Sequence, residues 1–197
     1  QMSLTKQAKT LNKSQIDAVR GYLRGRRNGL RNDTMFLLSV KAGLRAKEIA
    51  NLKWNMVVDS DGEVGEFLNI TNQASKGKSS GRAIFLHKDI KRNLVEMLDS
   101  GKIDVNNDYV IQSERSKSVS SQVVINFFHT LYKKLGIVGA SSHSGRRTFI
   151  TETSRKISSV GGSLRDIQYL AGHSNLQTTQ RYIESDEESK KKVISLI

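Results

Sequence analysis

Four residues in the last third of the chain have side chains that bind phosphate or move protons: His143, Arg146, His173 and Tyr182. The segment His143-Ser-Gly-Arg146 spaces a histidine and an arginine three residues apart, so both side chains lie on one face if the segment is helical. A guanidinium binds phosphate oxygens through two parallel hydrogen bonds, and an imidazole exchanges a proton near neutral pH. The spacing therefore predicts one cationic, proton-handling face.

His173 and Tyr182 are expected to lie on either side of a short helix. A capped helix that ends at Gly172 places His173 in a break, and a new helix restarts at Ser174 or Asn175. The inward stripe of this new helix consists of four positions at helical spacing: Leu176, Thr179, Gln180 and Ile183. Tyr182 is off that stripe. A tyrosine that its own helix does not turn inward, after a His and Arg cluster, is a candidate for chemistry.

The chain as a whole is strongly basic. It has 32 Lys and Arg against 19 Asp and Glu, a formal charge of +13 over 197 residues. Such an excess in a chain that is 37% hydrophobic favours a polyanionic partner, nucleic acid first and an anionic membrane surface second. No apolar run approaches the length of a membrane span and no signal peptide is visible, so we expect a cytoplasmic protein without a membrane partner.

The residue types also exclude several kinds of chemistry. The chain has no cysteine, which excludes disulfides, thiolate nucleophiles and cysteine-based zinc sites. The four histidines, at positions 87, 129, 143 and 173, lack the spacing of metal ligands, so no metal is expected.

The periodicity of apolar residues predicts one domain that is mainly α-helical with a small antiparallel β-sheet, an α+β fold. Residues 1–11 are interpreted as a polar lead-in segment. Helices are expected to begin at side chains that can cap a backbone N–H group: Ser14, Asn32 or Asp33, Ser120 or Ser121, and Ser163. The segments 67–71 and 82–86 alternate with period two and are interpreted as paired strands. Segment 108–112 is a candidate for a third short strand.

The turn between the two strands is rich in Ser and Gly and carries Lys76 and Lys78. The end of this turn, Gly77-Lys78-Ser79, resembles the end of a Walker A loop. Asn72, however, stands where such a loop needs its earlier glycine, so no nucleotide cofactor is expected.

Arg45 lies at the start of a short amphipathic helix that follows Gly43. Backbone N–H groups and the helix dipole at such a start favour an anion, so Arg45 is a further candidate for phosphate binding. The cations Lys47, Arg147 and Arg181 are interpreted either as DNA-backbone contacts or as surface charge. Lys78 is a further candidate for a DNA contact.

Taken in order, these residues resemble the catalytic domain of the tyrosine recombinases, also called phage-type integrases. The resemblance covers residues 12–184, which we interpret as that catalytic domain, with the fold of the DNA breaking-rejoining enzymes. It rests on four blocks in the order of the family: Ala42-Gly-Leu-Arg45-Ala-Lys-Glu-Ile49-Ala-Asn-Leu52-Lys-Trp54, the lysine turn, His143-Ser-Gly-Arg146, and Leu170-Ala-Gly-His173-Ser-Asn-Leu-Gln-Thr-Thr-Gln-Arg-Tyr182.

The resemblance implies a site-specific recombinase that cleaves and rejoins DNA through a covalent 3′-phosphotyrosine, without metal or ATP. It implies that Tyr182 is the nucleophile and that Arg45 and Arg146 hold the non-bridging phosphate oxygens. A free tyrosine has a pKa of about 10 and attacks poorly at neutral pH. Tyr182 therefore needs a neighbouring base or a positive field.

The resemblance assigns the proton transfers to the remaining candidates. His143 would accept or relay the tyrosine proton, and His173 would hydrogen-bond or orient the phosphate. Lys76 would protonate the departing 5′ oxygen, with Lys78 as the competing general acid.

Two other functions stay open: a type IB topoisomerase, which relaxes DNA through a similar site, and a non-catalytic DNA-binding regulator with the same fold. The expected partners are double-stranded DNA and, by resemblance, other copies of the chain in a tetramer on DNA. The resemblance also implies a bacterial or phage origin. Residues 185–197 form an amphipathic tail whose apolar end, 193–197, is a candidate protomer contact.

The chain departs from the family pattern at three positions. Ser144 and Gly145 stand where an acidic and an apolar residue are more common, and Arg147 stands where a histidine is common. Gly145 is expected to weaken a helix interior by up to about 1 kcal/mol. The N-terminal DNA-clamping domain usual in the family does not precede these blocks, so we expect either a catalytic fragment or a short family member.

Overall fold

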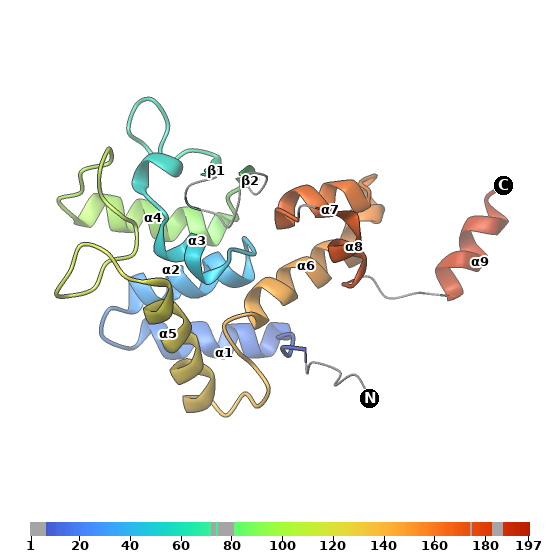
Figure 1. Cartoon of the computed structure of the whole chain (residues 1–197), viewed down its shortest axis with the longest axis horizontal. Helices are drawn as coiled ribbons and strands as arrows, with labels where there is room; N and C mark the ends of the chain where they lie inside the picture. Colours follow the sequence, from blue (N-terminus) through green and yellow to red (C-terminus); the bar gives the residue numbers. More distant parts are fainter. Residues whose placement is uncertain (1–6, 72–73, 75–80, 174, 183–186) are drawn as a thin grey trace.

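The computed structural model describes residues 7–71, 74, 81–173, 175–182 and 187–197 (Figure 1). Two strands pair antiparallel, β1 (Phe67–Ile70) with β2 (Arg82–Phe85). The helices, in chain order, are α1 (Lys13–Arg24), α2 (Gly29–Val40), α3 (Ala46–Ala50), α4 (Lys88–Ser100), α5 (Ser121–Lys134), α6 (Ser144–Ile157), α7 (Leu164–Ala171), α8 (Leu176–Gln180) and α9 (Glu187–Ser195). Short 3₁₀ helices span Trp54–Met56 and Ser158–Val160. The predicted fold class, mainly α-helical with a small antiparallel sheet, is confirmed.

Helix α2 lies at the centre of the core. Its side chains Phe36, Leu37 and Leu38 are fully buried, and it packs against α1, α4 and α6. Its residues 33–40 are buried on every side of the helix, and these neighbours provide the cover. The elements α3 and α6, which position Arg45 and Arg146, therefore both pack against this central helix.

The predicted start of α1 was wrong by two residues. Asn12, rather than Ser14, caps the helix: its side chain accepts a hydrogen bond from the backbone N–H of Gln15 at 2.8 Å, and the Gln15 side chain accepts from the backbone N–H of Asn12 at 3.0 Å. This reciprocal pair satisfies two backbone donors, which one serine could not do. The predicted caps Ser120 and Ser163 are confirmed.

The predicted start of α2 was also wrong, because the helix begins at Gly29, ahead of Asn32 and Asp33. Asp33 is fully buried inside the helix, and its carboxylate accepts hydrogen bonds from Arg20 and Arg24. A buried carboxylate with charged partners and a capping carboxylate look alike in the sequence, since both precede an apolar run.

Segment 108–112 does not add a third strand to the sheet. It pairs with the chain after α3 instead: the Trp54 N–H donates to the Asp108 carbonyl at 3.0 Å, and the Val110 N–H donates to the Leu52 carbonyl at 2.9 Å. Only an isolated antiparallel bridge forms there.

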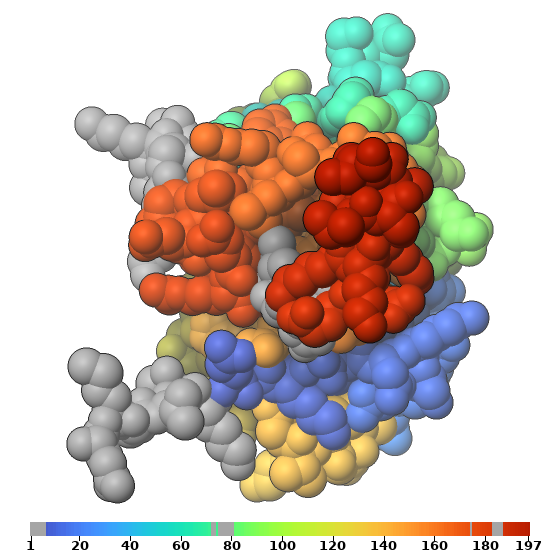
Figure 2. Space-filling view, turned by 90° about the vertical axis from the view of Figure 1, so that its right-hand side faces the viewer, coloured from blue at the N-terminus to red at the C-terminus, as the bar shows by residue number. Residues whose placement is uncertain are grey.

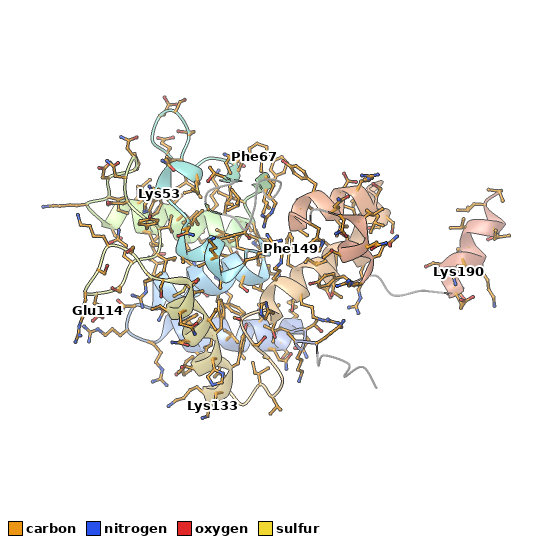
Figure 3. The ribbon with its side chains drawn as sticks, in the orientation of Figure 1. Lys53, Phe67, Glu114, Lys133, Phe149 and Lys190 are labelled. Atoms are coloured by element: carbon orange, nitrogen blue, oxygen red, sulfur yellow. The ribbon has the colours of Figure 1, made fainter. Side chains whose placement is uncertain are left out.

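Helix α6 crosses α2 so closely that position 145 has no room for a side chain. A Cβ atom there would lie 2.1 Å from Oγ of Ser39. Farther along α6, the ring of Phe149 covers Gly43, which has a φ of +68° and where a Cβ would lie 2.3 Å from that ring. Figure 3 labels Phe149 where α6 meets the body. Gly145, a departure from the family pattern, is thus explained by close helix packing.

Helix α7 follows α6 and packs against it, and α8 packs against α7 in turn (Figure 1). A small apolar cluster holds α6 and α7 together, formed by Ile150, Ile167 and Ala171. Helix α9 stands apart from the body in Figure 1 and lies in front of it in Figure 2. Every residue from 187 to 197 is exposed.

Candidate active site

Arg45 lies immediately before α3, at the helix start that the sequence predicts. Its backbone N–H donates to Oε1 of Glu48 at 2.8 Å, and its Nη1 donates to Oε2 of the same side chain at 3.4 Å. Its Nη2 donates to the carbonyl oxygen of Gly172 at 3.3 Å. The side chain is 26% exposed, so the guanidinium is held from the protein side and still reaches solvent.

Arg146 points inward from α6 and is buried. Its Nη1 donates to the carbonyl oxygen of Gly43 at 2.7 Å, and its Nη2 donates to that of Ala171 at 2.6 Å. Ala171 and Gly172 lie at the C-terminal end of α7, where the last carbonyl groups and the helix dipole attract cations. Arg45 and Arg146, far apart in the sequence, therefore meet at one helix end.

A third arginine, Arg82, and its partner Glu48 also belong to the site and were not predicted from the sequence. Nη1 and Nη2 of Arg82 donate to the two carboxylate oxygens of Glu48 at 2.7 and 3.1 Å, and Nε donates to the carbonyl oxygen of Leu170 at 2.9 Å. Both side chains are buried. One signal could have revealed them: the alternation of β2 places Arg82 on the inward face with Ile84, and an inward charge needs a buried partner.

The site carries three guanidinium charges around the carboxylate of Glu48. Burial, followed by the charges of Arg45 and Arg82, lowers the pKa of Arg146 to about 9, and burial also lowers the pKa of Arg45. Burial by itself would raise the pKa of Glu48, but the hydrogen bond and charge of Arg82 outweigh it and lower that pKa. Arg45, Arg146 and Glu48 are thus charged at neutral pH, and a bound anion would relieve the repulsion among the arginines.

His173 lies in the turn between α7 and α8, as predicted. Its Nδ1 is 2.8 Å from Oγ1 of Thr179, and the residue is buried. Burial, followed by the charges of Arg146, Arg45 and Arg82, lowers the pKa of His173 to about 4. The imidazole is therefore neutral at physiological pH and can hydrogen-bond a phosphate without adding charge.

Tyr182 follows α8, and its ring stacks on the imidazole of His173 with centroids 5.7 Å apart. The guanidinium carbon of Arg147 lies 5.9 Å from the centroid of the Tyr182 ring. A surface cleft beside this ring is lined by Gln7, Ala8, His143, Arg146, Arg147, Thr178, Arg181 and Tyr182. The structure thus brings His143, Arg146, His173 and Tyr182 together.

Two details differ from the sequence prediction. His143 is the exposed N-cap of α6 while Arg146 points inward, so the two side chains share a cleft rather than one exposed helix face. Within α8, Thr179 is buried as expected, but Gln180 is exposed, so the predicted inward stripe was wrong there. Helix α8 has five residues and packs against α7, which leaves its other sides open to solvent. Ile183 lies outside the described residues.

The lysine candidates of the strand turn, Lys76 and Lys78, also lie outside the described residues. Of the candidates for DNA contact, Lys47 is exposed on α3, whereas Arg147 and Arg181 line the cleft beside Tyr182. Within the described ranges, no three His, Asp or Glu side chains form a group that could hold a metal ion. No helix in the same ranges is long and apolar enough to cross a membrane.

Curated relatives that match most of this chain are named as tyrosine recombinases. The chain is 25% identical over 166 residues to "Tyrosine recombinase XerC" of Leptospira interrogans, covering 83% of this chain and 50% of the relative. It is 28% identical over 159 residues to the XerC of Lactobacillus delbrueckii subsp. bulgaricus, covering 78% and 50%. The chain therefore spans about half the length of the curated relatives that it matches.

Solved structures share the fold. The Tn1549 transposon integrase in complex with a circular intermediate DNA superimposes with a TM-score of 0.78 at 16% identity, covering 99% of this chain and 67% of that chain. The XerA recombinase gives a TM-score of 0.71 at 22% identity, covering 98% and 64%. A lambda integrase dimer bound to a core site gives a TM-score of 0.68 at 20% identity, covering 95% of this chain and 53% of that chain.

The family profile described as the phage integrase family matches residues 9–189, which is most of the chain. This match includes every element that carries a candidate site residue, from Arg45 before α3 to Tyr182 after α8. The predicted resemblance is confirmed: the chain belongs to the phage integrase family.

Proposed function

We propose that this protein is a site-specific DNA recombinase that cleaves and rejoins duplex DNA through a 3′-phosphotyrosine on Tyr182. The observation that carries the proposal is the convergence of Arg45, Arg146 and His173 at the end of α7, with Tyr182 stacked on His173. The names of the relatives support recombination as the activity. The neighbours solved in complex with DNA support duplex DNA as the substrate.

The reaction follows from the chemistry of these groups. The hydroxyl oxygen of Tyr182 attacks the scissile phosphorus, the bond from phosphorus to the 5′ oxygen breaks, and the 3′ end stays joined to the tyrosine. The proton of Tyr182 passes to His143, which lines the same cleft and is exposed. The 5′ oxygen takes a proton from Lys76, with Lys78 as the alternative donor. Attack by a 5′ hydroxyl of a second strand reverses these steps and rejoins the DNA.

The two arginines have different parts in binding the phosphate. Arg45 is the more exposed and binds a non-bridging oxygen directly, while Arg146 is held by two carbonyl oxygens at the floor of the cleft. Donors placed in advance stabilise the charge that develops in the transition state by about 3 kcal/mol each. His173 adds a neutral hydrogen bond. This set of groups needs neither a metal ion nor ATP.

The cations around the cleft are proposed to hold the DNA backbone. Arg147 and Arg181 line the cleft, and Lys47 is exposed on α3 close to Arg45 in the sequence. Backbone contacts of this kind weaken as salt rises, because binding releases counterions from DNA. Replacing Arg181 by Ala should therefore weaken binding similarly on every DNA sequence and reduce its salt dependence.

The test is covalent capture from a library of nicked duplexes with random sequence. Nicking lets the short cleaved strand diffuse away, so the covalent protein–DNA adduct accumulates, and sequencing the captured DNA identifies the preferred site. Tyr182→Phe should abolish the adduct, whereas Tyr109→Phe, a matched change far from the cleft, should leave it intact. An adduct that persists in Tyr182→Phe would refute the nucleophile, and no adduct from the parent chain would favour the regulator.

The captured DNA sequence then allows an experiment that distinguishes recombinase activity from topoisomerase activity. Two labelled duplexes carrying that site should exchange strands in the presence of the protein. Relaxation of a supercoiled plasmid without any exchange between sites would favour topoisomerase activity instead.

We also propose that the protein acts as a tetramer on DNA, with residues 185–197 as a contact between protomers. The apolar side chains of α9 and the residues after it are exposed and would be covered by such a contact: Val193, Ile194, Leu196 and Ile197. Replacing these four residues by Ser should weaken assembly on paired sites and leave single-site cleavage intact. Unchanged assembly would contradict the contact.

A further inference from the structure

Three arginines bond three successive carbonyl oxygens at the end of α7. The pairs are Arg82 with Leu170, Arg146 with Ala171, and Arg45 with Gly172, at 2.9, 2.6 and 3.3 Å. Two of these arginines differ in solvent exposure: the side chain of Arg82 is 1% exposed, whereas that of Arg45 is 26% exposed. A guanidinium enclosed in this way does not reach a DNA phosphate. Any effect of Arg82 on the reaction must therefore act through its neighbours.

The first neighbour is Glu48, whose carboxylate is shared by two arginines. Arg82 binds both of its oxygens, at 2.7 and 3.1 Å, whereas the guanidinium of Arg45 lies 3.4 Å from one of them. Arg82 is therefore the closer counter-ion of the buried carboxylate. Without it, Glu48 would draw the Arg45 guanidinium inward, because a buried charge without a close partner is costly.

The second neighbour is the turn that carries His173. Gly172 has a φ of +66°, and a Cβ atom there would lie 2.7 Å from Nη1 of Arg82. The turn therefore lies directly on the guanidinium, which also bonds the carbonyl of Leu170. Arg82 supports the backbone from which His173 reaches Tyr182.

We propose that Arg82 is a positioning residue for DNA cleavage. It neutralises Glu48 and holds the end of α7, so that Arg45 stays turned toward the scissile phosphate and His173 keeps its place beside Tyr182. The proposal rests on the proposed function, in which Arg45 and His173 bind that phosphate.

The first experiment compares two substrates in single-turnover cleavage by the full chain. Both are nicked duplexes of the captured sequence, one with the ordinary phosphodiester and one with a neutral methylphosphonate at the scissile position. Arg82→Gln should slow phosphodiester cleavage about 10- to 100-fold, as loss of supporting hydrogen bonds does at other sites. It should slow methylphosphonate cleavage much less, because the missing charge reduces the need for a correctly placed Arg45. Arg82→Lys, which keeps the charge without the two-pronged geometry, should fall between.

Arg20→Gln is the matched control, because Arg20 binds both oxygens of another fully buried carboxylate, that of Asp33, outside the site. Its melting temperature should fall, but at temperatures where it is folded it should keep the parent rate on both substrates. If Arg82→Gln and Arg82→Lys slow both substrates equally, or slow neither, the positioning role is wrong. A failure of the proposed function appears separately, as a parent chain that forms no adduct.

A second measurement does not depend on cleavage. Tungstate, a tetrahedral dianion shaped like phosphate, should raise the melting temperature of the parent chain by binding to the arginines. Arg45→Gln should remove most of this rise, Arg82→Gln or Arg82→Lys should reduce it, and Arg20→Gln should keep it. A full rise in both Arg82 variants would overturn the proposal whatever the cleavage result.

Discussion

The main body, α1 to α5 with the sheet, and the C-terminal helices α6 to α8 hold their functional residues in different ways. The body carries Arg45 and Arg82 on a large core of buried apolar side chains around α2. The C-terminal helices carry His173 and Tyr182 on a cluster with three buried members, Ile150, Ile167 and Ala171. Polar bonds from the arginines to the end of α7 join the two regions.

The proposed phosphate-binding group Arg45 and the proposed nucleophile Tyr182 therefore rest on unequal supports. Local stability rises with the buried apolar contacts of a segment, so α7 and α8 should open more readily than α2. The guanidinium–carbonyl bonds compensate in part, because each satisfies a carbonyl at the end of α7. Changes to the apolar core of the body should therefore act on folding, and changes to the arginines that bond the end of α7 should act on the reaction.

The largest effect is expected from Arg146→Ala, which removes a proposed phosphate-binding group, its bond to Gly43 across the junction and its bond to Ala171 at the end of α7. Single-turnover adduct formation should fall on the order of 10²- to 10³-fold, the usual cost of losing one preplaced donor. Arg26→Ala, which removes an arginine stacked on Tyr22 away from the cleft, is the control and should react at the parent rate. Equal rates for the two variants would remove Arg146 from the site.

The next prediction compares the stability of the two regions by shortening one buried side chain in each. Leu37→Ala in α2 should lower the free energy of unfolding of the whole chain by about 2–5 kcal/mol, because it leaves a cavity in the large core. Ile167→Ala should act mainly on α7 and α8. Hydrogen exchange measured by mass spectrometry would then rise in residues 164–182 with little change in α2. Equal acceleration in both regions would mean that they unfold as one unit.

A smaller effect is expected where α6 crosses α2. Gly145→Ala places a Cβ atom 2.1 Å from Oγ of Ser39, so the helices must separate slightly. Chemical denaturation should report a loss of about 1–3 kcal/mol. The double variant Ser39→Gly with Gly145→Ala should recover part of this loss, and additive losses would argue against the close contact.

The last effect concerns pH. The pKa of His173 is about 4 in the folded chain against 6.5 as its ordinary value, so between these values the unfolded state binds the extra proton. The free energy of unfolding should therefore fall as pH drops from 6.5 to 4. His173→Gln should weaken this fall relative to the parent, because a glutamine side chain does not take up the proton. Identical profiles for the parent and the variant would contradict the lowered pKa.

Local patterns predicted the fold and the neighbourhood of the site well. The break at Gly172 placed His173 correctly, because a left-handed glycine ends a helix in a way that adjacent residues reveal. The clustering of Arg45 with Arg146 followed from the family resemblance, since no local pattern links residues so far apart.

The features that the sequence did not predict depend on contacts between separate elements of the fold. Buried Asp33 looked like a cap because its arginine partners lie on another helix. Arg82 and Glu48 looked like ordinary charged residues for the same reason, because they pair with each other across the fold. Gly145 looked unfavourable for a helix because the sequence does not show its close contact with Ser39. In each case the deciding interaction joins separate elements, which periodicity and capping rules do not describe.

The most direct test of the central claim is to locate the DNA on the protein. Trypsin cleaves after Arg165, Arg181 and Lys190, so Tyr169 and Tyr182 fall on different peptides, residues 166–181 and 182–190. After capture on a nicked duplex and nuclease digestion, mass spectrometry should find the nucleotide remnant as a phosphotyrosine on peptide 182–190. A remnant on peptide 166–181, or on any other peptide, would contradict Tyr182 as the nucleophile.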